Sequence, residues 1–464
     1  MLLVGLVLFF VVSLIFCYIH FKKDIIHPSI IYSAVYVLSS LCALYNVDNW
    51  GINFKFLTFA ILVGGSVEFI LIGMLIKYLF EKKNKEPVVF ENKPLHVNNI
   101  VFAGVCVIGV IIVLMQIYFL IDTANKFGGY DSISGALKIY KDHVSYFNDY
   151  KLPHYFSLLC KILEMSSYIS IYIFSKKLLE NEKISFKVII KNSVYLVPVV
   201  LFFVKELLAS SRITLLSVIC AFIMIFMILW NCKSQWKKTI KLKILGIGIV
   251  AGCIGMVLFY ESAALIGRVN QKGLLDYVTC YAGGSIECFN RYGQEPIEKS
   301  EIPGAETFYN LYASLDRYGV THFDIESKHS IHLEYRYYGD SMVGNVYTAY
   351  RRWYHDFGIM GVLILNGIMS CFFHLIYYCF RYNKFKYMKH FTVILTGYLS
   401  WTLFMHPIDS YLYISVLQIT FCTNIFVFMV LCNSLFNIRI REKKLYYNET
   451  SVNEMVSLLR KIRI

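Results

Sequence analysis

Charged residues and prolines are scarce in this sequence. Asp, Glu, Lys and Arg make up 16% of the 464 residues, prolines number 8, and hydrophobic residues reach 57%. A water-soluble domain of ordinary composition has a larger polar share with which to cover its surface. The composition therefore excludes a soluble globular protein and indicates a chain whose solvent is a lipid bilayer.

Sequence patterns for nucleotides and metals are also absent. The chain has no GxxxxGK[ST] motif and no GxGxxG motif after a strand, the patterns that hold nucleotide phosphates. Its 13 Cys lie mostly in apolar runs, and Cys280 and Cys288, in a more polar segment, lack the spacing typical of zinc ligands. We expect no ATP hydrolysis, no cofactor and no metal, and a disulfide between Cys280 and Cys288 stays open.

Long apolar runs dominate the sequence. A helix needs about 20 residues to cross a bilayer, and runs of about that length occur at 1–20, 28–46, 55–80, 99–121, 155–175, 188–209, 213–231, 243–266, 357–380, 390–407 and 410–436. They predict an all-α polytopic membrane protein with about eleven transmembrane helices, within a range of about 10 to 12. The first run has no basic region before it and no small-residue cleavage site after it, so we expect a retained helix.

Basic residues mark every second connector between these runs. They are Lys22 and Lys23, Lys82 to Lys85, Lys176 and Lys177, Lys237 to Lys241, Arg381 to Lys389, and Arg439 to Lys444. Because Lys and Arg are enriched in cytoplasmic connectors, this pattern predicts an N terminus outside and a C terminus inside. The net charge of +14 is then a topology signal, and we expect membrane lipids but no nucleic acid as partners.

Two connectors on the outer face are long, and they divide the chain. Residues 1–266 hold eight predicted helices and a medium loop at 122–154, residues 267–356 form a large loop, residues 357–436 hold three helices, and residues 437–464 form a basic amphipathic tail. A loop of that length usually carries function. Within it, apolar residues recur at helical spacing from Thr307 to Tyr318, and Gly319 follows, which predicts an amphipathic helix.

Ionisable residues within apolar runs are costly and are functional candidates. They are Glu68, Lys161, Glu164, Lys205, Glu206 and Glu261. Near the predicted outer surface, Lys205 is joined by Arg212, Arg268, Arg351 and Arg352. Because guanidinium groups bind phosphate oxygens bidentately, such a cluster suits a lipid diphosphate. The alternative is that these residues only anchor helices at the headgroups.

Acid and base candidates gather in the large loop. They are Glu306, Asp324, Glu326, Glu334, Asp340, Asp356, His322, His329, His332 and His355. Spacing alone does not choose among them. Aromatic residues that could stack on sugar rings are Tyr309, Tyr312, Tyr335, Tyr337, Tyr338 and Trp353.

Several segments in and around this loop resemble the oligosaccharide repeat-unit polymerases, or O-antigen polymerases of the Wzy type. The segments are GNVYT, with Gly344, Asn345, Tyr347 and Thr348; DFGIMG, with Gly358; SSR at 210–212; YAGGSI and ETFYNLY in the loop; and His27, Pro28 and Ser29. The resemblance covers most of the chain in layout but only these segments in residues.

The resemblance implies a polymerase of undecaprenyl-diphosphate-linked oligosaccharides that works at the periplasmic face of the bacterial inner membrane, with a possible chain-length regulator protein as partner. It also implies functionally important arginines on that face, whose nearest counterparts here are Arg212, Arg268, Arg351 and Arg352. From the acid and base candidates of the loop we take Asp356, His355 and Glu306 as the catalytic residues. Alternatives are an O-antigen ligase, a flippase or transporter of lipid-linked glycans, and a protein with a purely structural role.

Overall fold

The computed structural model describes residues 1–83, 94–147, 149–211, 213–237, 257, 260–261, 273–296, 300–382, 389–436, 438–441 and 444–447. The helices of the first half are α1 (Leu2–His20), α2 (Pro28–Tyr45), α3 (Phe56–Lys83), α4 (Asn99–Lys126), α5 (Ile133–Lys141), η1 (Asp142–Tyr146), α6 (His154–Glu180), α7 (Phe186–Asn192), η2 (Ser193–Leu196), α8 (Val197–Leu208) and α9 (Ile213–Lys233). The second half contains α11 (Leu274–Tyr292), α12 (Tyr309–Arg317), α13 (Ile325–Lys328), β1 (Arg336–Tyr338), β2 (Ser341–Gly344), α14 (Ala349–Arg381), α15 (Lys389–Phe404), η3 (Leu412–Val416), α16 (Ile419–Phe436), β3 (Ile438–Arg441) and β4 (Lys444–Tyr447).

Nine helices of the described ranges are long and apolar enough to cross a membrane. They are α1, α2, α3, α4, α6, the Phe186–Leu208 segment, α9, α14 and α16. Each coincides with a predicted apolar run, which confirms a helical, multi-pass membrane protein. The run at 243–266 lies largely outside the described residues, and the run at 390–407 forms α15, which has 16 residues. The number of crossings and the orientation stay predictions.

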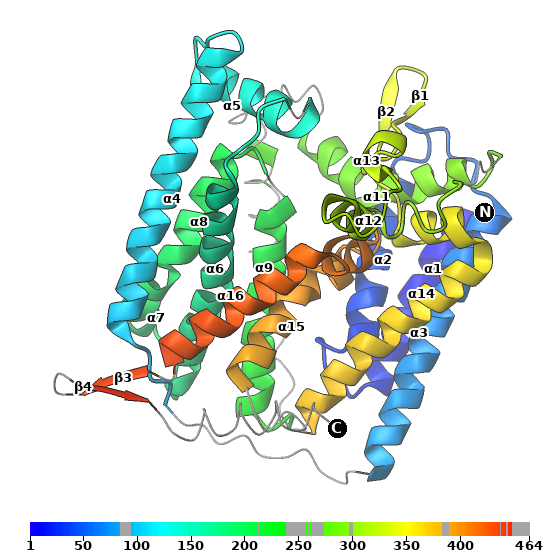
Figure 1. The fold of residues 1–464 in the computed structure, drawn as a ribbon. Helices are drawn as coiled ribbons and strands as arrows, with labels where there is room; N and C mark the ends of the chain where they lie inside the picture. The colour runs from blue at the N-terminus through cyan, green and yellow to red at the C-terminus, as the bar shows by residue number, and fades with distance from the viewer. Residues whose placement is uncertain are drawn as a thin grey trace.

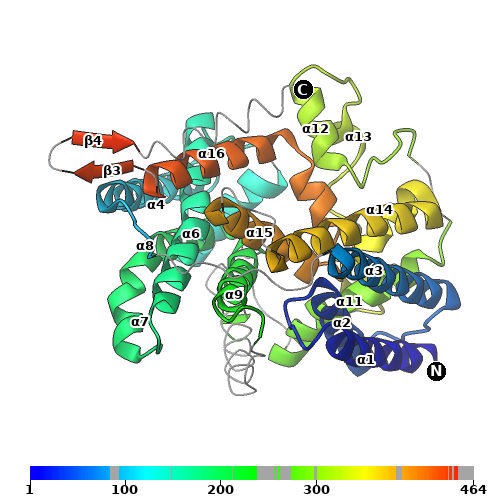
Figure 2. The same cartoon turned by 90° about the horizontal axis from the view of Figure 1, so that it is seen from below.

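The long helices form two groups, which Figures 1 and 2 show side by side. In one group α3 packs on α14, and α2 packs on both α1 and α11. In the other group α4, α6, α8 and α9 pack on one another, and α15 lies against α9 and also reaches α2. In hydrocarbon every backbone polar group must be bonded internally, which is why these apolar runs are helical.

The short elements of the two long loops lie at the same end of the long helices. Figure 1 shows α5, α12, α13 and the β1–β2 hairpin at this end, and the β3–β4 hairpin near the opposite end. The predicted amphipathic helix is confirmed as α12, and Gly319, with a φ of 68°, follows it. The β1–β2 and β3–β4 hairpins were not predicted. The predicted helix in the tail lies outside the described residues.

Candidate active site

The outer end of α14 carries most of the predicted site residues. Gly358 interrupts this helix with a φ of 64° and a ψ of −154°, so a short outer segment, residues 349–357, precedes the membrane-spanning part. The sequence had placed residues 349–356 in the large loop, because the apolar run begins only at 357. Helical spacing brings Arg351, Arg352, His355 and Asp356 to one side of the outer segment.

All four of these side chains contact Glu306, which lies in the turn before α12. Arg351 Nη1 pairs with one carboxylate oxygen of Glu306, and His355 Nε2 lies 3.5 Å from the other. Arg352 Nη1 donates to the backbone carbonyl of Glu306 at 3.4 Å, and the Glu306 backbone N–H donates to Asp356 at 3.4 Å. The other Asp356 oxygen accepts from the N–H of Thr307 at 2.7 Å. Glu306 is therefore fixed in orientation by one helix.

His355 connects Tyr292 to Glu306 through its two ring nitrogens. His355 Nδ1 lies 2.6 Å from the hydroxyl of Tyr292, the last residue of α11. Burial raises the pKa of Tyr292 to about 12, although Arg351 opposes this shift, so the hydroxyl keeps its proton. The Tyr292 hydroxyl can donate to Nδ1 or accept from it, and the second ring nitrogen of His355 faces Glu306. The Glu306 carboxylate is the last group in this chain of polar contacts.

Arg351 sits between this carboxylate and two tyrosine rings. Its guanidinium carbon lies 4.0 Å from the ring centre of Tyr292 and 5.5 Å from that of Tyr347. Arg351 also reaches Glu334 at 3.3 Å, yet its Nε is buried and has no hydrogen-bond partner among the described side chains and backbone. A buried donor without a partner is costly, so Nε is available to a further acceptor.

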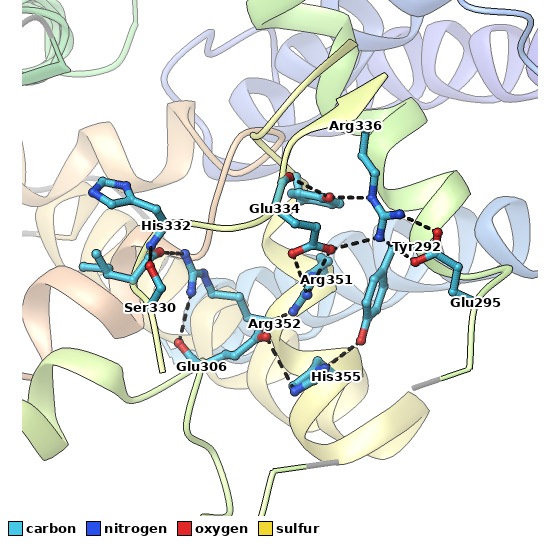
Figure 3. A network of polar contacts seen from close by, with 12 residues as sticks. Tyr292, Glu295, Glu306, Ser330, His332, Glu334, Arg336, Arg351, Arg352 and His355 are labelled. Carbon is cyan, nitrogen blue, oxygen red and sulfur yellow. Dashed lines mark hydrogen bonds and ion pairs between the residues drawn. The ribbon is translucent and has the colours of Figure 1, made fainter. Parts of the chain in front are cut away.

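Carboxylates and arginines alternate from Arg351 toward the solvent, as Figure 3 shows. Glu334 bridges Arg351 and Arg336, whose Nη2 lies 3.0 Å from Glu334 and 2.6 Å from Glu295. The side chains of Glu334 and Glu295 are 42% and 48% exposed, whereas those of Glu306 and His355 are 12% exposed. The Glu306–His355 pair therefore lies just below the surface, at the inner end of a polar path from the solvent.

A second ion pair joins this site to the turn after α15. Arg352 Nε and Nη2 lie 2.7 and 2.9 Å from the two carboxylate oxygens of Asp409, a bidentate geometry. Arg352 also donates to the carbonyl of Ile331 at 2.9 Å. Sequence reasoning missed Asp409, Tyr292 and Arg336. Asp409 could have been noticed as an acidic residue at an outer connector, but nothing local marks the other two.

The motif residues shape the backbone around the site. Gly344 has a φ of 149° and Thr348 is the N-cap residue of α14. The Tyr347 hydroxyl accepts from Arg336 Nε at 2.9 Å and donates to the carbonyl of Glu334 at 3.1 Å. Asn345 is partly exposed next to them, and Gly358 forms the break in α14.

Cys280 and Cys288 are both free thiols. Cys280 Sγ donates to the carbonyl of Val343 at 3.0 Å, and Cys288 Sγ to that of Gly344 at 3.6 Å. These thiols attach α11 to β2, and the open question of a disulfide between them is answered in the negative.

The structure does not bring the whole predicted basic cluster together. Lys205 lies in the other helix group, where its Nζ is 2.6 Å from Glu206, and Figure 1 shows α8 far from α14. Arg212 and Arg268 lie outside the described residues. Arg351 and Arg352 are 4% and 2% exposed and are paired with carboxylates, so they serve first to position Glu306.

The predicted aromatic residues separate into exposed and buried ones. Tyr335, Tyr337 and Tyr338, in and beside β1, are each about half exposed, at 52%, 55% and 48%. Tyr309 and Trp353 are buried. The hairpin therefore presents three phenol rings beside the rim of the site.

No protein-family model matches the chain, and no match is found among the curated proteins or the solved structures. The described site, a positioned carboxylate with a histidine and arginines, can accept a proton and hold an anionic group.

Proposed function

We propose that this protein is a membrane glycosyltransferase that polymerises undecaprenyl-diphosphate-linked oligosaccharide repeat units at the periplasmic face of a bacterial inner membrane. The observation that carries the proposal is the set of contacts between α14 and Glu306. The side chain, the backbone N–H and the backbone carbonyl of Glu306 are each bonded to a different residue at the start of α14. Such rigidity around one partly accessible carboxylate is what a general base needs.

In the proposed reaction, Glu306 takes the proton from a hydroxyl of the incoming repeat unit. The hydroxyl oxygen then bonds to the anomeric carbon of the growing glycan, and the bond from that carbon to the lipid diphosphate breaks. A carboxylate base that activates an attacking oxygen is established chemistry at anomeric carbons. The leaving diphosphate keeps the bonding electrons and is stabilised by cations. We assign this role to Arg351, whose buried Nε has no hydrogen-bond partner among the described residues.

The exposed tyrosines of the β1–β2 hairpin support a glycan substrate. Phenol rings offer flat faces for sugar rings, and Tyr335 and Tyr337 lie 6.4 Å apart between ring centres. Carboxylates at the rim, Glu334 and Glu295, can accept hydrogen bonds from sugar hydroxyls. The basic connectors support a position of this end of the helices outside the cytoplasm.

The test is complementation of a deletion strain at matched membrane abundance. Glu306→Gln keeps the size of the side chain but removes its basicity, and we expect the polysaccharide ladder to shrink to one repeat unit. The matched control is Glu326→Gln in the same loop, because Glu326 is exposed and pairs with Arg317 away from the site; its ladder should be normal. A full ladder with Glu306→Gln contradicts the proposal.

The same strains separate the alternatives. A ligase defect leaves polymer on the carrier lipid, and a transporter defect leaves repeat units on the cytoplasmic face. Single repeat units that reach the outer face but fail to lengthen are the result specific to a polymerase.

A further inference from the structure

A groove beside α3 and α14, on a side where Ile364 and Ile368 are exposed, contains a carboxyl group. The groove has a volume of about 470 Å³ and is lined by Glu68, Ile72, Leu363, Ile364, Gly367, Ile368 and Cys371. Apart from Glu68 these residues are apolar or weakly polar. The groove is far along α14 from the Glu306 site, and the proposed function does not use it.

Glu68 lies near the middle of the bilayer. It is the thirteenth residue of α3, a helix of 28 residues, so at a rise of about 1.5 Å per residue it lies roughly 18 Å from the start of the helix. The hydrocarbon core is about 30 Å thick. A carboxylate at this depth is costly, and the neutral, protonated carboxyl is the form that hydrocarbon favours.

The two oxygens of Glu68 have different surroundings. Oε2 accepts a hydrogen bond from Asn366 Nδ2 at 2.8 Å. Oε1 lies close to Gly367, since a Cβ added at Gly367 would be 3.0 Å from this oxygen. Gly367 thus leaves room for an oxygen that faces the groove, which is where a proton can be bound and released.

Asn366 connects Glu68 to the outer segment of α14. Its Nδ2 also donates to the carbonyl of Gly65 at 2.9 Å, and its Oδ1 lies 3.5 Å from the hydroxyl of Tyr350. Tyr350 is in turn hydrogen-bonded to Tyr32 and precedes Arg351 in the sequence. These bonds pass across the break at Gly358, so they join the two parts of α14.

We propose that Glu68 is a proton-binding site reached from the hydrocarbon phase, and that its hydrogen bonds to Asn366 and Tyr350 couple it to the helical segment that carries Arg351. The titratable side chains that face it are Cys371 from α14, which lines the same groove, and the hydroxyls of Tyr350 and Tyr32. The neighbouring α1 contains no Asp, Glu, Lys or Arg. Glu68 is therefore the one carboxyl group among the residues that line this groove.

Dicyclohexylcarbodiimide tests the site in the native membrane. This apolar reagent takes the proton of a carboxylic acid onto one nitrogen while the carboxylate oxygen bonds to its central carbon, and the product rearranges to a stable N-acylurea. We expect one adduct per chain on the peptide that contains Glu68, with a rate that falls as the pH rises. A water-soluble carbodiimide at the same concentration should leave this peptide unmodified.

Three variants complete the experiment. Glu68→Gln, whose carbonyl can still accept from Asn366, should abolish the adduct. Glu164→Gln, a matched change in α6, should leave it unchanged. Prior reaction of Cys371 with N-cyclohexylmaleimide fills the groove and should slow the carbodiimide at least tenfold, whereas in Cys371→Ala the maleimide should have no effect.

Peptide mapping of the wild-type chain decides the outcome even if a variant fails to fold. An unmodified Glu68 peptide, equal reaction with the water-soluble reagent, or a rate independent of pH overturns the proposal. An adduct that maleimide at Cys371 does not slow overturns the assignment of the groove as its route.

Discussion

Replacement of Asp409 by alanine should destabilise the protein strongly, because it leaves the Arg352 guanidinium buried without its carboxylate. Arg352 is 2% exposed, whereas Asp409 is 16% exposed. Removal of one partner of a buried ion pair costs about 3–5 kcal/mol, while replacement of both by apolar residues of similar volume is close to neutral. We therefore expect the free energy of unfolding to fall by an amount at the upper end of this range in Asp409→Ala. The loss should be smaller in Arg352→Met, because water can reach the Asp409 carboxylate that this change leaves unpaired.

The assay is thermal unfolding of the purified protein in detergent, followed by intrinsic fluorescence. The double variant Arg352→Met/Asp409→Leu should recover most of the melting temperature that Asp409→Ala loses. The carbonyls of Ile331 and Glu306 lose a donor in the double variant, so recovery should be incomplete. A wild-type melting temperature for Asp409→Ala, or a lower one for Arg352→Met than for Asp409→Ala, would refute the reasoning.

Three further predictions concern single residues of the outer loop. Gly304→Ala should lower the melting temperature more than Gly319→Ala. Both glycines have a positive φ, which costs an L-residue about 1–3 kcal/mol. A Cβ added at Gly304 would also lie 2.7 Å from Phe308, whereas a Cβ added at Gly319 meets no atom within 4 Å. Although burial opposes the effect, two neighbouring arginines hold the pKa of Glu334 below its ordinary value. The ionised Glu334 carboxylate therefore stabilises the folded protein above about pH 4.3, and this stabilisation is lost as the pH falls. Glu334→Gln should reduce the difference in melting temperature between pH 7 and pH 4. Burial raises the pKa of the Cys288 thiol, so this residue should resist iodoacetamide in the native protein and react after unfolding; rapid native alkylation would contradict its placement.

The membrane helices could be predicted from the sequence because their signal is local. A run such as 99–121 is apolar over the whole length that a bilayer requires, and α4 forms there. Amphipathic spacing likewise predicted α12 within two residues at its start. The β1–β2 hairpin was missed, because its strands have three and four residues and carry exposed tyrosines on a loop that showed helical spacing elsewhere.

The arrangement of the candidate site could be predicted only in part. Glu306, His355 and Asp356 were chosen mainly from their residue types. His355 and Asp356 meet Glu306 from one helical segment because α14 starts at Ala349. The onset of the apolar run does not indicate this start. Tyr292 lies 63 positions from its partner His355. No local pattern encodes a contact at such a separation, so it depends on the tertiary packing that brings the last turn of α11 to the first turns of α14.

Polymerisation by the purified protein is the measurement that tests the central claim most directly. Wild type and Glu306→Gln are reconstituted in liposomes with lipid-linked repeat units from the deletion strain, and products are sized with time. We predict that wild type makes a ladder, that Glu306→Gln is slower by about 10²–10⁴-fold, as expected for loss of a general base, and that Glu326→Gln matches wild type. Equal rates for wild type and Glu306→Gln would contradict the account.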